Sequence, residues 1–134
     1  MRIRRIIVSL FLCTAIAAAA LPAFALSGSD IHDVYRYNIG VCARCTSTIN
    51  SSLAKAELDL SYLPDPTNHL PEDDYSVIAE VDITIGNTTY QFKPPHVAGM
   101  HTSTTITDLS SDVTAISCKY YLNNDNVSFY HYDV

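Results

Sequence analysis

Three cysteines are the residues of this chain best suited to chemistry. Cys42 and Cys45 form a C-x-x-C motif in the first half of the sequence, and Cys118 lies near its C-terminus. A C-x-x-C pair works as a redox couple when its first cysteine begins a helix, because the helix N-terminus stabilises the thiolate. The stretch 46–52 is rich in Ser, Thr and Asn, which are poor helix formers. We therefore do not interpret the motif as a thioredoxin-type catalytic site.

A metal site is the second kind of chemistry that these thiols permit. Cys42, Cys45 and Cys118, completed by His131, would give zinc or copper a tetrahedral ligand set. Only one paired half-motif is present, whereas structural zinc sites usually have two. We therefore expect no metal and no cofactor. The four-residue set is the less favoured alternative, a thiol or metal protein of the cell envelope.

A structural disulfide is the favoured interpretation of the cysteines, because we expect the chain to be exported to an oxidising compartment. Alternation along the expected strands directs Cys45 and Cys118 inward and Cys42 outward. A Cys45–Cys118 bridge ranks slightly ahead of Cys42–Cys118 and Cys42–Cys45. It would close a loop of some seventy residues and stabilise the fold by roughly 4 kcal/mol in the chain-entropy model.

The N-terminal segment 1–25 has the three parts of a secretory signal peptide. Met1–Arg5 is positively charged, the stretch 6–21 is apolar, and Ala23-Phe24-Ala25 fits a small-x-small cleavage site. We expect cleavage after Ala25, a single mature domain at 26–134, and a secreted or periplasmic location. No second apolar run follows, so the sequence predicts no transmembrane segment in the mature chain.

The charge of the chain limits its partners. The 134 residues include 8 Lys and Arg against 14 Asp and Glu, a net charge of −6 at pH 7. Arg2, Arg4 and Arg5 lie in the leader, so the mature domain keeps five cations against fourteen acids, a formal charge of −9. Nucleic acids and anionic membrane surfaces both favour basic proteins. We therefore expect no nucleic-acid partner, and a protein or a carbohydrate instead.

Alternating apolar and polar residues predict β-strands through most of the mature chain. The clearest case is a hairpin from Val77 to Lys93, with Gly86-Asn87 as its two-residue turn. Apolar residues then meet on one face of the hairpin, and an acid meets a base on the other, which supports this register. The predicted pairs are Val81–Phe92, Ile83–Tyr90, Ile85–Thr88, Thr84–Thr89 and Glu80–Lys93.

A second hairpin is expected at the C-terminus, with its loop centred on Asn124-Asp125. This loop predicts the cross-strand pairs Leu122–Val127, Tyr120–Phe129 and Cys118–His131. Tyr121, Tyr130 and Tyr132 would then share the outer face. Flat aromatic rings suit sugars and proteins alike, so these three tyrosines are the candidate binding surface.

Three further segments complete the predicted fold. Residues 54–62 alternate like a strand, although a helix over 53–63 is the competing interpretation. Residues 31–41 are β-prone, and we expect a short strand at Thr102–Thr107. Within the segment 31–41, a strand would place the alternate residues Tyr35, Tyr37, Ile39 and Val41 on the same face. About six or seven strands with turns between them indicate an all-β domain, a small antiparallel sandwich or barrel.

Motifs for catalysis are missing from the sequence. It has no G-x-S-x-G, no H-E-x-x-H and no phosphate-binding glycine loop. We therefore expect a protein that is not an enzyme. The expected function is that of an exported, non-catalytic binding or structural β-domain, which contacts protein or carbohydrate through a sheet face or edge.

Overall fold

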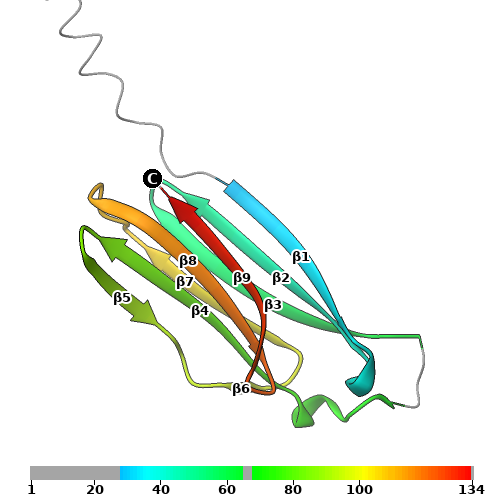
Figure 1. Cartoon of the computed structure of the whole chain (residues 1–134). Coiled ribbons are helices and arrows are strands. Elements are labelled where there is room, and N and C mark those ends of the chain that lie inside the picture. Colours follow the sequence, from blue (N-terminus) through cyan, green and yellow to red (C-terminus); the bar gives the residue numbers. More distant parts are fainter. Residues whose placement is uncertain (1–27, 65–67, 134) are drawn as a thin grey trace, which may run out of the picture.

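The computed structural model describes residues 28–64 and 68–133 of the chain. This part forms two antiparallel sheets that pack face to face (Figure 1). No strand pairing joins the edges of the two described sheets, so the domain is a sandwich and not a barrel. The predicted signal peptide and its cleavage site lie outside the described residues. Within the described ranges, no helix is long and apolar enough to cross a membrane.

The first sheet has the strand order β1-β2-β3-β7, and the second has the order β5-β4-β8-β9, with the short β6 also paired to β4. The described ranges therefore hold nine strands, more than the six or seven expected. The first sheet consists of β1 Gly28–Arg36, β2 Val41–Asn50, β3 Leu53–Tyr62 and β7 His101–Thr107. The second consists of β4 Ser76–Ile85, β5 Thr88–Phe92, β6 Val97–Ala98, β8 Val113–Leu122 and β9 Asp125–Asp133. The 3₁₀ helices η1 Tyr37–Ile39 and η3 Glu72–Asp74 lie between strands.

The predicted central hairpin is confirmed by β4 and β5. Val81 pairs with Phe92 and Ile83 with Tyr90, as the two-residue turn requires. Gly86 has φ +61°, a left-handed conformation that glycine adopts without strain. The strand predicted at 54–62 is β3, so the helical alternative for this segment is wrong.

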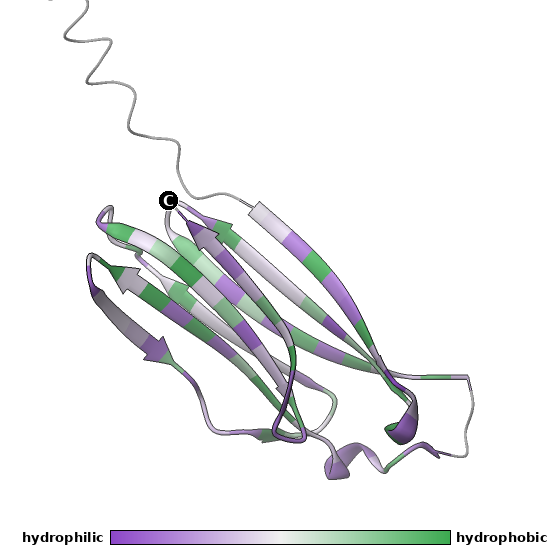
Figure 2. Cartoon of the chain, in the orientation of Figure 1, coloured by the Kyte–Doolittle hydropathy of each residue, from purple (hydrophilic) through white to green (hydrophobic). Residues whose placement is uncertain are grey.

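The core fills the space between the two sheets. Alternate residues of β2, β3 and β8 are buried, which appears in Figure 2 as alternating apolar and polar bands along the strands. The central strand β4 is buried on both faces over most of its length. Tyr75 and Tyr120 are the largest fully buried side chains. The hydroxyl of Tyr75 donates to the carbonyl oxygen of Ile39 at 2.7 Å, which fixes the η1 turn to the core.

The predicted strand over 31–41 is wrong in its second half. The chain leaves β1 at Arg36, makes the η1 turn, and reverses at Gly40, which has φ +68°. It returns as β2, with Arg36 opposite Val41. The expected common parity of Tyr35, Tyr37, Ile39 and Val41 is lost, because Tyr37 and Ile39 lie in the η1 turn between the strands of Tyr35 and Val41. Val41 is buried, whereas Tyr35 and Tyr37 are exposed.

The C-terminal hairpin exists, but its predicted register is wrong, by two residues at Leu122 and by one residue beyond Val127. The two turn residues are Asn123 and Asn124, which both have positive φ, as a type I′ turn requires. Val127 is then an extra residue in β9, and the register shifts beside it. The observed pairs include Leu122–Asp125, Tyr120–Ser128, Lys119–Phe129, Cys118–Tyr130 and Ser117–His131. Tyr130 and Tyr132 consequently pack toward the core, and Phe129 and His131 are exposed.

Candidate functional site

The two long sides of the sandwich differ in how they are covered. On one side β1 and β9, the edge strands of the two sheets, contact each other. The Tyr132 hydroxyl donates to Asp30 Oδ2 at 2.8 Å, and the His32 ring meets Tyr130 edge to face at 6.1 Å. Side chains therefore close this side.

The opposite side, between β5 and β7, is open. β4 packs across from β7 and β3, and β8 packs across from β3 and β2, whereas β5 has its main contacts with its hairpin partner β4. Tyr90 and Phe92 of β5 pair with the buried residues Ile83 and Val81 of β4, so their side chains point to the same inner face of the sheet. They are nevertheless 50% and 40% exposed, because no described strand of the first sheet lies opposite β5.

An apolar groove of about 270 Å³ lies on this open side, near the end of β7 and the segment that follows it. We call it the β5–β7 groove. It is lined by Ile83, Ile85, Tyr90, Phe92, Ile106, Thr107, Asp108, Leu109, Ser110 and Val113. Asp108 is the charged member of this set. The volume falls below the ~300–1,000 Å³ usual for drug-sized ligands, so the groove suits one or two apolar side chains.

The edge strand β7, whose last residues Ile106 and Thr107 line the groove, presents unpaired backbone groups on its outer side. The Leu60 N–H donates to the Met100 carbonyl oxygen at 2.7 Å, and the β3–β7 register continues this bonding through the even-numbered residues of β7. In an antiparallel ladder, the residues between bonded pairs turn their N–H and C=O groups to the other side. Ser103, Thr105 and Thr107 therefore direct their backbone groups away from β3.

The edge of β7 also lacks the protection that exposed edge strands normally have. Lysine, proline or a bulge usually blocks such an edge against pairing with another chain. Between Thr102 and Thr107 there is no charged residue and no proline, whereas β5 is followed by Lys93-Pro94-Pro95. The Thr104 hydroxyl donates to the Ala79 carbonyl oxygen at 2.6 Å, which holds β7 against β4. β7 is thus a fixed edge with open hydrogen-bonding groups.

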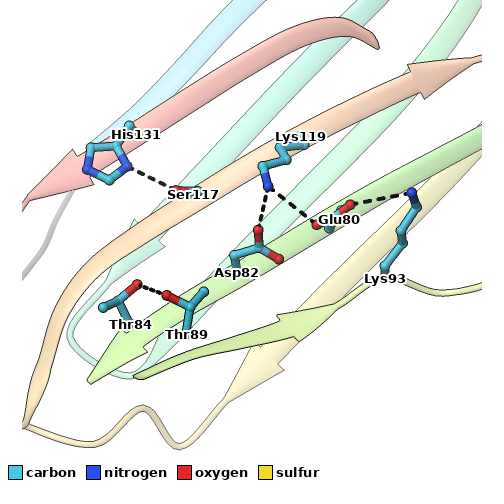
Figure 3. Close-up of polar contacts among 8 residues, drawn as sticks. All are labelled: Glu80, Asp82, Thr84, Thr89, Lys93, Ser117, Lys119 and His131. Carbon is cyan, nitrogen blue, oxygen red and sulfur yellow. Dashed lines mark hydrogen bonds and ion pairs between the residues drawn. The ribbon is translucent and has the colours of Figure 1, made fainter. Parts of the chain in front are cut away.

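A buried ionic cluster occupies the outer face of the second sheet (Figure 3). Lys119 Nζ lies 2.7 Å from Asp82 Oδ2 and 3.6 Å from Glu80 Oε1, and Lys93 Nζ lies 3.9 Å from Glu80 Oε2. Burial raises the pKa of Glu80, and the neighbouring Asp82 raises it further. The two lysines balance the two carboxyl groups, so this cluster joins β4 to β8 and to Lys93, the residue that follows β5.

The cysteines lie where strand alternation predicts. Cys45 and Cys118 are fully buried between the sheets, and Cys42 is half-buried. Cys42 shares its parity with the exposed Arg44, so it lies on the outer face of the first sheet. All three are free thiols in the structure. Burial raises the pKa of the Cys45 thiol to about 12 and that of Cys118 to about 11, so neither is poised for nucleophilic chemistry.

Two of the three candidate disulfides do not fit this geometry. Cys42 and Cys45 are three residues apart in one extended strand, which separates their Cα atoms by roughly 10 Å, beyond the ~7 Å limit of a disulfide. Cys42 and Cys118 lie on the outer face of one sheet and the inner face of the other. Cys45 and Cys118 face the same interior, and their bridge stays a prediction.

The four-residue metal set does not come together. His131 lies on the outer face of the second sheet, where Nδ1 bonds the Ser117 hydroxyl at 2.9 Å and Nε2 lies 2.7 Å from Asp133 Oδ1. The predicted pairing of Cys118 with His131 fails because of the one-residue change in register. In the described ranges, no group of three or more His, Cys, Asp or Glu side chains could hold a metal ion. Cys42, Cys45, Cys118 and His131 therefore do not form one ligand set in the structure.

The predicted tyrosine surface is divided between two faces. Tyr121 lies on the outer face, with Lys93 Nζ 4.4 Å from its ring centroid. Tyr130 and Tyr132 instead pack against the core. The sequence did not predict the β5–β7 groove. Alternation placed Tyr90 and Phe92 on the inward face, and it carries no signal of whether another strand covers them.

Comparisons with family models, with curated proteins and with solved structures find no match for this chain. The geometry of the molecule therefore carries the functional argument.

Proposed function

We propose that this chain is an exported, non-catalytic binding domain that holds a segment of a partner protein in the β5–β7 groove. The observation that supports this proposal is the exposure of Tyr90 and Phe92 beside an unprotected edge strand. Exposed aromatic side chains that gather in one groove, unlike those scattered singly over a surface, mark interaction sites. Aromatic residues also dominate the binding energy of protein interfaces.

The first test is a selection from a random heptapeptide library on the purified exported protein. Selected peptides are labelled, and their binding is measured by fluorescence anisotropy. We expect Phe92→Ser to weaken binding at least tenfold, roughly the effect of removing one anchoring aromatic side chain. Tyr37→Ser is the matched control, since Tyr37 is 70% exposed and lies outside the groove, and it should leave binding unchanged. An empty selection, or equal binding by Phe92→Ser, would overturn the proposal.

Export is the second component of the proposal, and it rests on the charged, apolar and small-x-small segments of residues 1–25. N-terminal sequencing of the protein recovered outside the cytoplasm should begin at Leu26. Recovery in the cytoplasm with Met1 retained would contradict it.

Carbohydrate binding on the first sheet is a second candidate function. Tyr35 and Tyr37 stack at 6.0 Å with their planes 16° apart, and both rings are exposed. Tyr35 pairs with Cys42, which lines a shallow depression of about 200 Å³ together with Arg44 and Asp59. Aromatic platforms beside polar groups suit sugar rings. A glycan panel should then give binding that Tyr37→Ala abolishes and Phe92→Ser does not affect.

A further inference from the structure

We propose that the bound segment joins the first sheet as a fifth strand, paired with the free edge of β7 and lying opposite β5. This inference rests on the proposed function and specifies the binding mode and the partner. The occupant is an extended segment of another protein, with alternating apolar residues and a cationic residue at one end.

The backbone of β7 provides the first argument. Ser103, Thr105 and Thr107 direct their N–H and C=O groups away from β3, and the strand between Thr102 and Thr107 has no charge or proline to prevent pairing. A strand beside β7 would lie about 4.8 Å from it and extend the hydrogen-bonding ladder. Among the described segments, none pairs with this edge.

The side chains of β5 provide the second argument. The second sheet extends one strand beyond the first at this side, since β4 packs over β7 and β5 lies further out. A fifth strand beside β7 would therefore cover Tyr90 and Phe92. Its alternate side chains would enter the groove, where about 270 Å³ accommodates one or two of them. Alternation in the partner thus follows from the geometry of the site.

Charge provides the third argument, and it favours a foreign segment over a second copy. The chain has a net charge of −6, and the charged residue of the groove is Asp108, at the C-terminal end of β7. A second copy would bring like charge to this face, whereas a segment with Lys or Arg beside Asp108 would complement it. The partner is therefore neutral or basic.

N-methylation of the peptide separates strand addition from simple filling of the groove. The probe is the tightest heptapeptide from the selection above, synthesised in two forms that are N-methylated at odd or at even positions. In a strand, only every second N–H faces β7. We expect one form to bind at least tenfold more weakly and the other to bind as before. Equal affinities of the two forms would overturn strand addition while leaving the groove as the site.

Two protein variants test the same edge. Thr105→Pro removes an N–H that faces away from β3, and we expect it to weaken peptide binding at least tenfold. Gln91→Pro is the matched control, because the β4–β5 register directs its N–H to the outer edge of β5, and it should bind normally. Unchanged binding by folded Thr105→Pro would contradict the proposal.

Amide hydrogen exchange gives a measurement that does not depend on the variants. Exchange at Ser103, Thr105 and Thr107 should slow at least tenfold when the peptide binds, because new hydrogen bonds protect these amides. Binding without this protection would overturn strand addition. A dimer in sedimentation equilibrium that Thr105→Pro dissociates would assign the strand to a second copy, and would overturn the choice of a foreign partner.

Discussion

Glu80 is a carboxylic acid whose ionisation the fold makes less favourable. It lies on the outer face of the second sheet, yet it is only 3% exposed. Burial raises its pKa above the ordinary value of 4.5, and the adjacent Asp82 raises it further, whereas Lys119 and Lys93 act in the opposite direction. A carboxyl group with a raised pKa binds its proton more tightly in the folded than in the unfolded state. The free energy of unfolding therefore falls as the pH rises through the folded-state pKa.

Replacing Glu80 by glutamine should stabilise the protein at neutral and alkaline pH. Glutamine resembles the protonated carboxyl group, so Glu80→Gln and the natural protein should be equally stable below about pH 4.5. The variant should be the more stable one at about pH 8, where the natural carboxyl group ionises at a cost. Urea denaturation across this range measures the difference. Glu57→Gln is the control, since Glu57 forms a half-exposed ion pair with Lys55 at 2.9 Å and should show no such gain.

A less stable Glu80→Gln variant at alkaline pH would contradict this interpretation. It would show that the ion pairs of Glu80 with Lys119 and Lys93 outweigh the cost of burying its charge.

At the scale of the elements, two glycine turns fix the β1–β2 and β4–β5 hairpins. Gly40 and Gly86 both have positive φ, +68° and +61°, which residues with a side chain rarely adopt. Their surroundings differ. A Cβ atom on Gly40 would lie 2.5 Å from Cδ2 of His69 and 3.0 Å from the backbone, whereas a Cβ atom on Gly86 would meet open space.

Because their surroundings differ, we expect substitution of Gly40 and of Gly86 by alanine to lower the stability by different amounts. Gly86→Ala carries only the strain of a left-handed alanine and should lower the free energy of unfolding by about 1 kcal/mol. Gly40→Ala adds a steric clash and should cost roughly 1–3 kcal/mol more. Thermal denaturation of both variants measures the difference. Equal melting temperatures would mean that His69 moves away freely, and that its 2.7 Å contact with the Leu63 carbonyl oxygen does not hold it.

At the scale of the whole molecule, a buried polar contact joins the two sheets. The Ser47 hydroxyl of β2 lies 2.6 Å from the Tyr120 hydroxyl of β8, which donates to the Thr46 carbonyl oxygen at 2.8 Å. Ser47 and Tyr120 are both fully buried. The hydroxyl of Tyr130, also buried, has no hydrogen-bond partner in the described part of the chain.

The two tyrosines should therefore respond in opposite ways to loss of the hydroxyl group. Tyr120→Phe should destabilise the fold by about 1–3 kcal/mol, because it leaves buried groups on β2 without their partner. Tyr130→Phe should be neutral or stabilising, because it removes an unpaired buried hydroxyl. Urea denaturation measures the change in the free energy of unfolding for each variant. A larger decrease for Tyr130→Phe than for Tyr120→Phe would contradict the hydrogen-bond assignment.

Features that depend on neighbours in the sequence could be predicted from the sequence. Alternation over β3 and β4 and the turn at Gly86-Asn87 determined these strands and the register of β4 with β5. The same alternation directed Cys45 and Cys118 inward. Each of these features follows from the two-residue period of a strand and from the backbone freedom of one glycine.

The candidate site was decided by the tertiary structure. The register of β9 depends on two left-handed asparagines and on Val127, which is inserted as an extra residue and buried at 8% exposure. That single shift divided the predicted tyrosine surface and moved His131 away from the cysteines. The groove arises because β7 of the other sheet lies beneath β4 and leaves β5 uncovered. Whether a side chain is buried depends on segments that lie far apart in the chain. Alternation within one strand predicts only which face a side chain points to, and not what covers that face.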